Sequence, residues 1–350
     1  MPPSTTRQWI LNSKPTETPI LTGPSPTFKL TTAPLPKTIS RSQALLKTIL
    51  LSNDPAQRTW IAPNVDPTRM YMPPIAEGAP MGSFALAEVI KSSSPTDLPV
   101  GKYSANEIAG LQAVTPIEGL DLGHYLGAFG FTGLTGYYGI KEVAKATKED
   151  TVVVSGAAGA TGSMVVQIAK KIIGCKRVIG IAGNDEKCCW VERLGADVCI
   201  NYKKDTFEQD LIRETEGFVE VYFDNVGGGM LDLMLTRMKR HGRIAACGSI
   251  SNYNTPDPVG VKNFFDVISN RLHIHGLIVL DYVHKFSDVV AELLQAWKEG
   301  KIIIDDSLQT VVEAKFEEVP AVWMKLFDGG NTGEVMYEDC GLATLWFCLV

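Results

Sequence analysis

The sequence predicts an α/β protein in which a doubly wound parallel sheet is accompanied by a second, β-rich domain. Between about residues 120 and 300, apolar runs alternate with amphipathic stretches of about ten to fifteen residues, which is the pattern of βαβ units. Residues 1 to about 115 carry short apolar runs separated by turns rich in proline, threonine and serine, and the end of the chain returns to this β-like texture. We therefore expect one domain from 1–118 and 301–350 and a parallel-sheet domain from 119–300.

Composition places the protein among ordinary globular proteins. Of its 350 residues, 45% are hydrophobic and 21% are charged, which is an average balance. The formal net charge of -6 argues against nucleic acid and anionic membranes as partners. No apolar run is long enough for a signal peptide or a membrane helix, and seven irregularly spaced cysteines indicate reduced thiols. We therefore expect a cytoplasmic protein.

Each expected element rests on its own local pattern. In the first domain, "ALLKTILLS" and "GSFALAEVI" are apolar runs bounded by turn residues and predict strands. In the second domain, strands are expected at 151–156, 177–182, 198–202, 219–226, 242–248 and 272–279. Helices are expected at 162–173, 186–195, 207–216, 229–242 and 285–300. Right-handed crossovers would place these helices on both faces of the sheet.

The strongest local signal is the glycine-rich loop in "TVVVSGAAGATGSMVVQIAKKIIG". An apolar strand ends there in a G-x-x-G-x-x-G spacing, and the helix that follows is expected to end at Gly174, a C-cap glycine. Small residues allow the backbone to approach a pyrophosphate, and the helix offers unpaired N–H groups and the positive end of its dipole. Between a strand and a helix this spacing predicts a dinucleotide site rather than a tight turn alone. The expected contact residues are Gly156, Gly159, Ala160, Thr161 and Gly162.

The end of the second strand decides between NAD and NADP. NAD sites place an acidic residue there to bind the ribose hydroxyls, but this strand ends in Ala182. Asp185 and Glu186 follow at the start of the next helix, where capping residues and acids are favoured without any ligand. Lys187, one turn into that helix, can reach the uncharged space beside Ala182, although a solvated helix lysine would also explain it. The missing acid favours NADP(H).

Motifs in order along the chain carry a resemblance to a known family. They are "SNDPAQRTWI", "GAFGFTGLTGYYGI", "SGAAGATGSMVVQIAK", "GNDEK", "NYK", "YFDNVGG", "RIAACGSISNYN" and "GGNTG". Over roughly residues 5–90 and 115–335 they resemble the zinc-independent leukotriene B4 dehydrogenase/prostaglandin reductase and alkenal double-bond reductase branch of the medium-chain dehydrogenase/reductases, in its fungal type. The resemblance implies a Rossmann domain, a GroES-like β-barrel catalytic domain and a homodimer. It also implies NADPH-dependent reduction of the carbon–carbon double bond of α,β-unsaturated aldehydes and ketones, in some fungal relatives within polyketide-derived pathways.

The resemblance also assigns roles to individual residues. Lys187 and Tyr202 would hold the 2′-phosphate end of the cofactor, and Asn331 would reach the cofactor from the returning segment. Tyr253 is the expected donor to the substrate carbonyl, a contact that stabilises the negative charge developing on that oxygen. The residues expected beside the ribose and nicotinamide are Asn225, Cys247, Gly248 and Ser249. Without the resemblance, the asparagines fit equally well as turn residues and Tyr253 as a loop aromatic.

A zinc-dependent alcohol dehydrogenase is the contrasting member of the superfamily. Zinc catalysis requires about three protein ligands around an open position. The chain through residue 118 contains no cysteine and no histidine. His273 and His275 share one face of an expected strand, but no third ligand accompanies them in the sequence. We therefore expect no metal.

Departures from the family pattern bear on the substrate and on activity. Ala56 stands where many relatives carry an aromatic residue. This difference either opens an apolar pocket, expected to include Leu277, Val279 and Tyr282, or moves the donor role elsewhere, so that Tyr253 carries more of it. Relative to the family, "KSSSPTDLPVGKYSANEIAGLQAV" lacks the length for a strand pair, so we expect a truncated barrel with unpaired edges. The apolar chain end, "CGLATLWFCLV", replaces a short closing strand and is either a partner-binding tail or the product of a mispredicted exon.

The leading hypothesis is an enone or enal reductase that acts on an apolar carbonyl substrate. A quinone reductase or secondary-alcohol dehydrogenase of the same fold is one alternative. A catalytically impaired NADPH-binding or interaction protein is another, motivated by the expected truncation. The last expected strand of the parallel sheet, in "HIHGLIVL", presents an apolar edge that a homodimer would cover.

Overall fold

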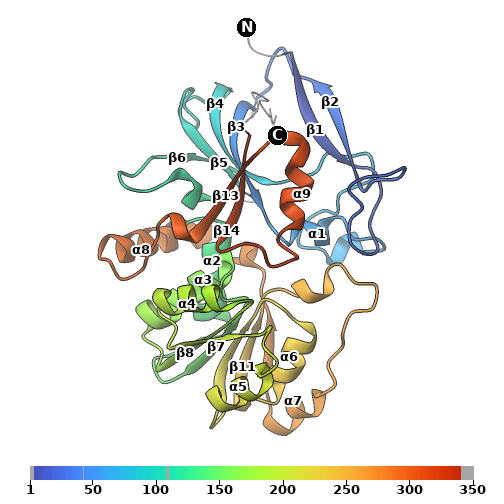
Figure 1. Cartoon of the computed structure of the whole chain (residues 1–350). Helices are drawn as coiled ribbons and strands as arrows, with labels where there is room; N and C mark the ends of the chain where they lie inside the picture. The colour runs from blue at the N-terminus through green and yellow to red at the C-terminus, as the bar shows by residue number, and fades with distance from the viewer. Residues whose placement is uncertain (1–3, 42, 108–109, 340–350) are drawn as a thin grey trace. The chain divides into compact units, whose positions relative to one another are not determined.

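The computed structural model describes residues 4–41, 43–107 and 110–339. The chain divides into two compact units (Figure 1). Unit 1 comprises the residues up to Leu126, the segment Gln309–Gly330 and the chain from Val335, and unit 2 comprises Gly127–Leu308 and Asn331–Glu334. The returning chain therefore contributes a short piece to unit 2 before it re-enters unit 1.

Unit 1 is built mainly from antiparallel strand pairs. β1 and β2 form a two-stranded ribbon, and within the described residues six further strands form a sheet in the order β13–β14–β3–β4–β5–β6. The strands are β1 Thr5–Leu11, β2 Phe28–Pro34, β3 Ala44–Asn53, β4 Phe84–Ser92, β5 Tyr103–Glu107, β6 Gly110–Val114, β13 Gln309–Ala314 and β14 Glu334–Asp339. The runs "ALLKTILLS" and "GSFALAEVI" are confirmed as strands β3 and β4.

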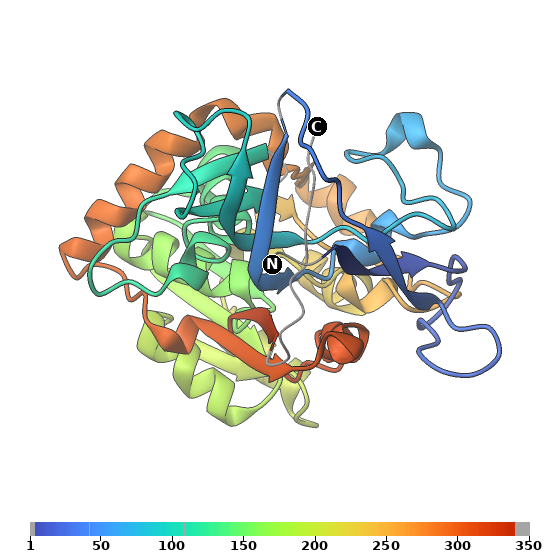
Figure 2. The same ribbon diagram turned by 90° about the horizontal axis from the view of Figure 1, so that it is seen from above.

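A hydrophobic core joins the β1–β2 ribbon to helix α9 (Val319–Met324). The ring of Trp323 makes an edge contact with Phe28 of β2 at a centroid distance of 5.9 Å and another with Phe327 at 5.2 Å. Its Nε1 donates to the carbonyl oxygen of Asp54 at 3.0 Å, so the buried indole is both packed and hydrogen-bonded. Helix α9 therefore lies against the ribbon, as Figures 1 and 2 show.

The expected loss of a strand pair is wrong. β5 continues the sheet beside β4, with Ala87 opposite Ser104, and β6 pairs with β5, with Tyr103 opposite Val114. The pair is short rather than missing, because five residues on each side are enough to extend an antiparallel ladder. β4 is thus covered on both sides, and the unit-1 sheet does not end at β4.

Unit 2 contains a parallel sheet in the order β12–β11–β10–β7–β8–β9. This is the strand order of a doubly wound Rossmann fold, and it confirms the predicted α/β class. The strands are β7 Thr151–Ser155, β8 Arg177–Ala182, β9 Val198–Asn201, β10 Val219–Asp224, β11 Met238–Ala246 and β12 His273–Gly276. The helices are α2 Phe131–Tyr138, α3 Ala160–Gln167, α4 Asp185–Leu194, α5 Phe207–Glu214, α6 Gly228–Leu235, α7 Phe264–Asn270 and α8 Phe286–Lys298. Order reverses between β7 and β10, and ligands of such sheets bind beyond the carboxyl ends of the strands at that point.

Two expected boundaries in unit 2 need correction. Helix α6 ends at Leu235, and the expected continuation to residue 242 is wrong because Met238 already pairs with Val219 of β10 as the first residue of β11. The last strand is also shorter than expected. It ends at Gly276, after which the chain turns into a 3₁₀ helix over Val279–Lys285.

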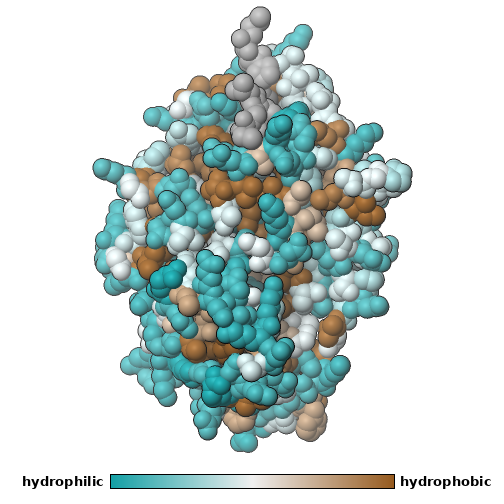
Figure 3. Space-filling model, in the orientation of Figure 1, coloured by the Kyte–Doolittle hydropathy of each residue, from teal (hydrophilic) through white to brown (hydrophobic). Residues whose placement is uncertain are grey.

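The face shown in Figure 3 is mostly hydrophilic, and apolar residues occur on it in separate small groups. In the part of the chain that the structure describes, no helix combines the length and the apolar character needed to cross a bilayer.

Candidate dinucleotide site

The glycine loop follows β7 at the point where the strand order of unit 2 reverses. Gly156 has a φ of +59°, a left-handed conformation that favours glycine. A Cβ at Gly162 would lie 2.2 Å from the Gly156 carbonyl oxygen, so no side chain fits there. Gly159 is the N-cap of α3, and the helix begins at Ala160. The loop therefore presents bare backbone and the unpaired N–H groups of a helix N-terminus, as a pyrophosphate requires.

Helix α2 supports the start of α3 through small residues. A Cβ at Gly136 would lie 3.2 Å from the carbonyl oxygen of Thr161 and equally close to the Val165 side chain. The two helices thus approach more closely than larger residues would allow. Helix α3 passes into a π-helical turn and ends at Gly174 with a left-handed φ of 77°, which confirms that glycine as the C-cap. Its first turn, with Ala160 and Thr161, is fixed from both sides.

The end of β8 carries no acid, as expected. The strand ends at Ala182, and Asn184 caps α4 by accepting from the Lys187 backbone N–H at 2.7 Å. Asp185 is held by Lys204 at 2.7 Å and accepts from the Asn201 side chain at 3.0 Å. These two contacts lower the pKa of the Asp185 carboxyl. The carboxylate is thus already paired within the surface of unit 2.

Lys187 and Asn331 meet at this end of the sheet. The Lys187 ammonium donates to the Asn331 carbonyl oxygen, so the structure brings together two residues that the sequence places 144 positions apart. Burial, followed by the nearby positive charge of Lys203, lowers the pKa of Lys187. The positive charges of Lys187 and Lys203 together form an environment that an anionic phosphate would stabilise.

Tyr202 forms one wall beside these lysines. Its backbone N–H donates to the Ala182 carbonyl oxygen at 3.0 Å, which fixes the residue at the end of β9. A Cβ at Gly183 would lie 3.3 Å from the Tyr202 ring, so the ring covers the bare backbone of that glycine. The side chain is 44% exposed and therefore remains accessible to a ligand.

The returning segment is joined to the glycine loop by backbone contacts. Gly333 forms an isolated bridge with Gly159, and its N–H donates to the Ala158 carbonyl oxygen at 2.9 Å. The Asn331 side chain donates to the Gly333 carbonyl oxygen at 3.0 Å. These bonds hold Asn331 beside the loop and thereby position its carbonyl oxygen for Lys187.

A second group of predicted residues meets at the end of β10. Asn225 donates its side-chain N–H to the Ser155 carbonyl oxygen at 2.7 Å, and its backbone N–H donates to the Ser155 hydroxyl at 3.1 Å. The N–H groups of Cys247 and Gly248 both donate to the Asp224 carbonyl oxygen. A Cβ at Gly248 would lie 3.0 Å from the Asn225 carbonyl oxygen. Asn225 and the 247–249 turn therefore form one packed edge at the carboxyl ends of β10 and β11.

Tyr253 belongs to this second group. Its hydroxyl accepts a hydrogen bond from the Ser249 backbone N–H at 3.2 Å. Gly227, with a φ of +67°, lies against Ser249, because a Cβ there would meet the Ser249 hydroxyl at 2.4 Å. The phenol oxygen is thus held next to the turn expected to border the nicotinamide.

The predicted substrate-pocket residues are divided between the two units. Leu277 and Val279 are buried in unit 2, and a Cβ at Gly139 would lie 2.6 Å from the Leu277 side chain. Tyr282, also in unit 2, stacks on Tyr138 with a centroid distance of 4.4 Å. Ala56 is the N-cap of α1 (Gln57–Trp60) in unit 1. Their contact with a substrate stays a prediction.

The described residues contain no group of three or more His, Cys, Asp or Glu side chains arranged to hold a metal ion. The rings of His273 and His275 lie parallel at a centroid distance of 6.0 Å, as neighbouring residues on one strand face do.

Sequence reasoning missed three contributors to the site. Lys203 adds the second positive charge beside Lys187, and the pair of lysines in "NYKK" was a visible signal for it. Ser155 orients Asn225, and Gly333 joins the returning segment to the loop. For the last two no local pattern exists, because their partners lie far away in the sequence.

Two family models match this chain. The model described as zinc-binding dehydrogenase matches residues 160–296, and the model described as N-terminal domain of oxidoreductase matches residues 7–116. The first lies within unit 2 and contains most of the dinucleotide site. The second lies within unit 1.

Characterised relatives align with most of the chain. It is 34% identical to the 2-alkenal reductase (NADP⁺-dependent) of Nicotiana tabacum over 84% of this chain and 86% of that protein. It is 33% identical to prostaglandin reductase 1 of Bos taurus over 89% of this chain and 93% of that protein. Among solved structures, CurA of Vibrio vulnificus in complex with NADPH is similar with a TM-score of 0.82 and 28% identity, covering 96% of this chain and 100% of that chain.

Replacing Lys187 by alanine is expected to weaken NADPH binding by about tenfold or more, because a charge-assisted contact to phosphate is lost. NADH binding should change by less than about twofold, since NADH lacks that phosphate. Isothermal titration with both cofactors measures the two effects. Arg193→Ala, at the far end of the same helix, is the control and should leave both affinities unchanged. Equal losses for NADPH and NADH in Lys187→Ala would refute the assignment.

Proposed function

This chain belongs to the alkenal double-bond reductase and prostaglandin reductase branch of the medium-chain dehydrogenase/reductases, and from that premise we propose that it reduces the carbon–carbon double bond of α,β-unsaturated aldehydes and ketones with NADPH. One observation supports NADPH as the cofactor in this proposal. Lys187 contacts the Asn331 carbonyl oxygen near the end of β8, where the strand carries no acidic residue. The relatives named above support the proposed reaction.

The residues present fit NADPH on structural grounds. The loop at Gly156 and Gly162 has no room for side chains where a pyrophosphate would approach. At the adenosine end, Lys187 and Lys203 supply positive charge, and Asp185 does not cancel it because Lys204 and Asn201 already bind it. A 2′-phosphate is favoured there over free ribose hydroxyls.

When bound, the nicotinamide supplies the hydride that reaches the β-carbon of the enone. The protein must stabilise the negative charge that develops on the substrate carbonyl oxygen. We assign that donor role to the Tyr253 hydroxyl, which the Ser249 N–H holds beside the 247–249 turn. A phenol both accepts and donates hydrogen bonds, so the Ser249 contact orients the ring while the O–H serves the substrate. Hydride delivery itself requires no acid–base residue. The enolate that it leaves then takes up a proton from solvent at the α-carbon, which completes the reduction of the double bond.

An apolar enone derived from a polyketide is the natural substrate that we propose, on the resemblance to fungal reductases. The quinone reductase, the alcohol dehydrogenase and the catalytically impaired binding protein remain the competing functions. The described cysteines, Cys175, Cys188, Cys189, Cys199 and Cys247, are free thiols, which supports the proposed cytoplasmic location because that compartment keeps thiols reduced.

NADPH oxidation is expected with enals and enones in a panel that also contains quinones and secondary ketones. With deuterium-labelled NADPH, the label should appear on the carbon β to the carbonyl, because that carbon accepts the hydride. Mass spectrometry and NMR of the product locate it. Label on a carbinol carbon would establish the alcohol dehydrogenase instead. NADPH binding without oxidation by any member of the panel would establish the impaired protein.

Tyr253→Phe is expected to lower kcat for an active enone by about 100-fold, the scale of removing one oxyanion donor. The Kd for NADPH should stay nearly unchanged, because the hydroxyl is assigned to the substrate. Stopped-flow reduction and fluorescence titration measure the two quantities separately. Undiminished kcat would remove Tyr253 from the catalytic residues, and a parallel loss of NADPH affinity would show that it orders the cofactor turn instead.

We also propose a homodimer that covers the free edge of the unit-2 sheet. β12 is the last strand of that sheet, and all four of its residues are exposed. Beside this strand in the sequence, α7 presents Phe264, Phe265 and Ile268, of which Phe265 is 73% exposed. An open strand edge with apolar neighbours is a surface that proteins normally cover.

Sedimentation velocity should therefore find a dimer, and Ile274→Asp on β12 should shift it towards monomer, because the new charge would be buried in the interface. Val311→Asp, at an exposed valine of unit 1, is the matched control and should leave the dimer intact. A wild-type protein that sediments only as a monomer would defeat the proposal.

A further inference from the structure

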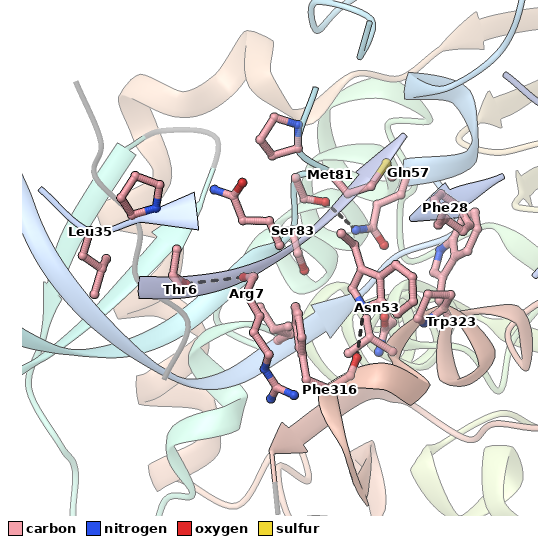
Figure 4. Close-up of a pocket in the computed structure, with 18 of the residues that line it drawn as sticks. Thr6, Arg7, Phe28, Leu35, Asn53, Gln57, Met81, Ser83, Phe316 and Trp323 are labelled. Carbon is pink, nitrogen blue, oxygen red and sulfur yellow. Dashed lines mark hydrogen bonds between the residues drawn. The ribbon is translucent and has the colours of Figure 1, made fainter. Parts of the chain in front are cut away.

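Unit 1 contains a cavity of about 340 Å³ that shares no residue with the dinucleotide site (Figure 4). Its walls come from the β1–β2 ribbon, the end of β3, the segment before β4, and α9 with the turn that precedes it. The volume lies within the range of small-molecule sites. The cavity is therefore large enough for a ligand, although nothing in the proposed reductase chemistry uses it.

The walls are mainly apolar. Large apolar side chains from four separate parts of unit 1 face the cavity, and Figure 4 shows Phe28, Met81, Phe316 and Trp323 among them. The neighbouring Trp9 side chain is held in place because its Nε1 donates to the Phe316 carbonyl oxygen at 2.9 Å. A ligand here would gain most of its binding free energy by leaving water.

The Asn53 side chain in the wall carries a donor that makes no hydrogen bond to the described residues. Asn53 is 4% exposed, and its Nδ2 makes no hydrogen bond within the described residues 4–41, 43–107 and 110–339. The backbone cannot turn the side chain towards solvent, because Asn53 pairs with Val335 in the β3–β14 ladder. Buried side-chain donors without a partner are uncommon in folded proteins. An amide fixed in an apolar wall is therefore positioned to donate to a ligand acceptor.

The other polar groups near Asn53 are already engaged within the protein. Gln57 donates to the Gly82 carbonyl oxygen at 2.8 Å and accepts from the Asp54 N–H at 3.0 Å. The Ser83 hydroxyl donates to the Ser52 carbonyl oxygen at 2.6 Å. At the same cavity, Arg7 pairs with Glu317 at 2.7 Å, so its charge is balanced. These contacts do not select a charged ligand.

We propose that this cavity binds a neutral, mainly apolar molecule that presents one carbonyl oxygen to the Asn53 side-chain amide. The apolar walls select the body of the ligand, and the unpartnered Asn53 amide selects a compound with an acceptor over a hydrocarbon of equal size. The cavity lies within unit 1, and none of its lining residues is among those assigned to NADPH.

Prodan, a neutral naphthyl ketone whose fluorescence shifts to shorter wavelength in apolar surroundings, tests the proposal with the full chain and saturating NADP⁺. A blue-shifted, saturable signal is expected, and a long-chain methyl ketone should displace prodan more effectively than the alkane of the same length. Asn53→Leu keeps the apolar volume and removes the donor. It should weaken ketone binding by about fivefold and leave alkane binding unchanged, so that the preference for the ketone disappears.

Val319→Trp fills the cavity from α9 and should abolish prodan binding, whereas Val311→Trp, the same substitution at an exposed valine outside the lining, should not. Circular dichroism and thermal unfolding establish that each variant is folded. Absence of saturable prodan binding by the wild type would overturn the proposal. Prodan binding that survives Val319→Trp, or that only the enone substrate displaces, would also overturn the proposal, because prodan would then occupy the reductase site. An unchanged preference for the ketone in Asn53→Leu would overturn it as well.

Discussion

The close approach of Gly162 to the Gly156 carbonyl oxygen is the constraint on which the rest of unit 2 depends. A Cβ at Gly162 would lie only 2.2 Å from the Gly156 carbonyl oxygen. Any side chain there would therefore push the start of α3 away from the end of β7. The helix N-terminus would then no longer present its N–H groups beside the loop. A Cβ at Gly136 on α2 would lie 3.2 Å from the Thr161 carbonyl oxygen, and Gly159 forms the backbone bridge to Gly333 of the returning segment.

Charge at the adenosine end follows from this arrangement. The bridge from Gly159 to Gly333 fixes Asn331, and its carbonyl oxygen then receives the Lys187 ammonium. Lys187 is held half-buried beside Lys203, where both burial and repulsion lower its pKa. A phosphate bound near these cations would offset the repulsion that Lys187 experiences. We propose that this arrangement of charge favours a phosphorylated dinucleotide.

The fold and the cofactor loop were predictable from the sequence because their causes are local. Short stretches of sequence predict three of these features, and the structure confirms them: the strand–glycine–helix order, the strand end at Ala182 without an acid, and the C-cap at Gly174. Contacts over long sequence separations, such as the bridge between Gly159 and Gly333, have no local pattern that predicts them. The β5–β6 hairpin is local, but it was misjudged because five residues on each side carry little alternation.

The two units use polar groups in opposite ways, and this difference distinguishes the two candidate sites. In the dinucleotide site, glycine exposes the backbone, and side chains such as Asn225 are tied to their neighbours, so the ligand meets a rigid, prearranged surface. In the unit-1 cavity, the backbone of Asn53 pairs with Val335 in the β3–β14 ladder, and its side-chain Nδ2 makes no hydrogen bond to the described residues. A buried donor in that state destabilises the empty protein by about 1–3 kcal/mol relative to a bonded one. Because a ligand acceptor removes that cost, occupancy of the cavity would stabilise unit 1 itself, whereas the dinucleotide acts on unit 2.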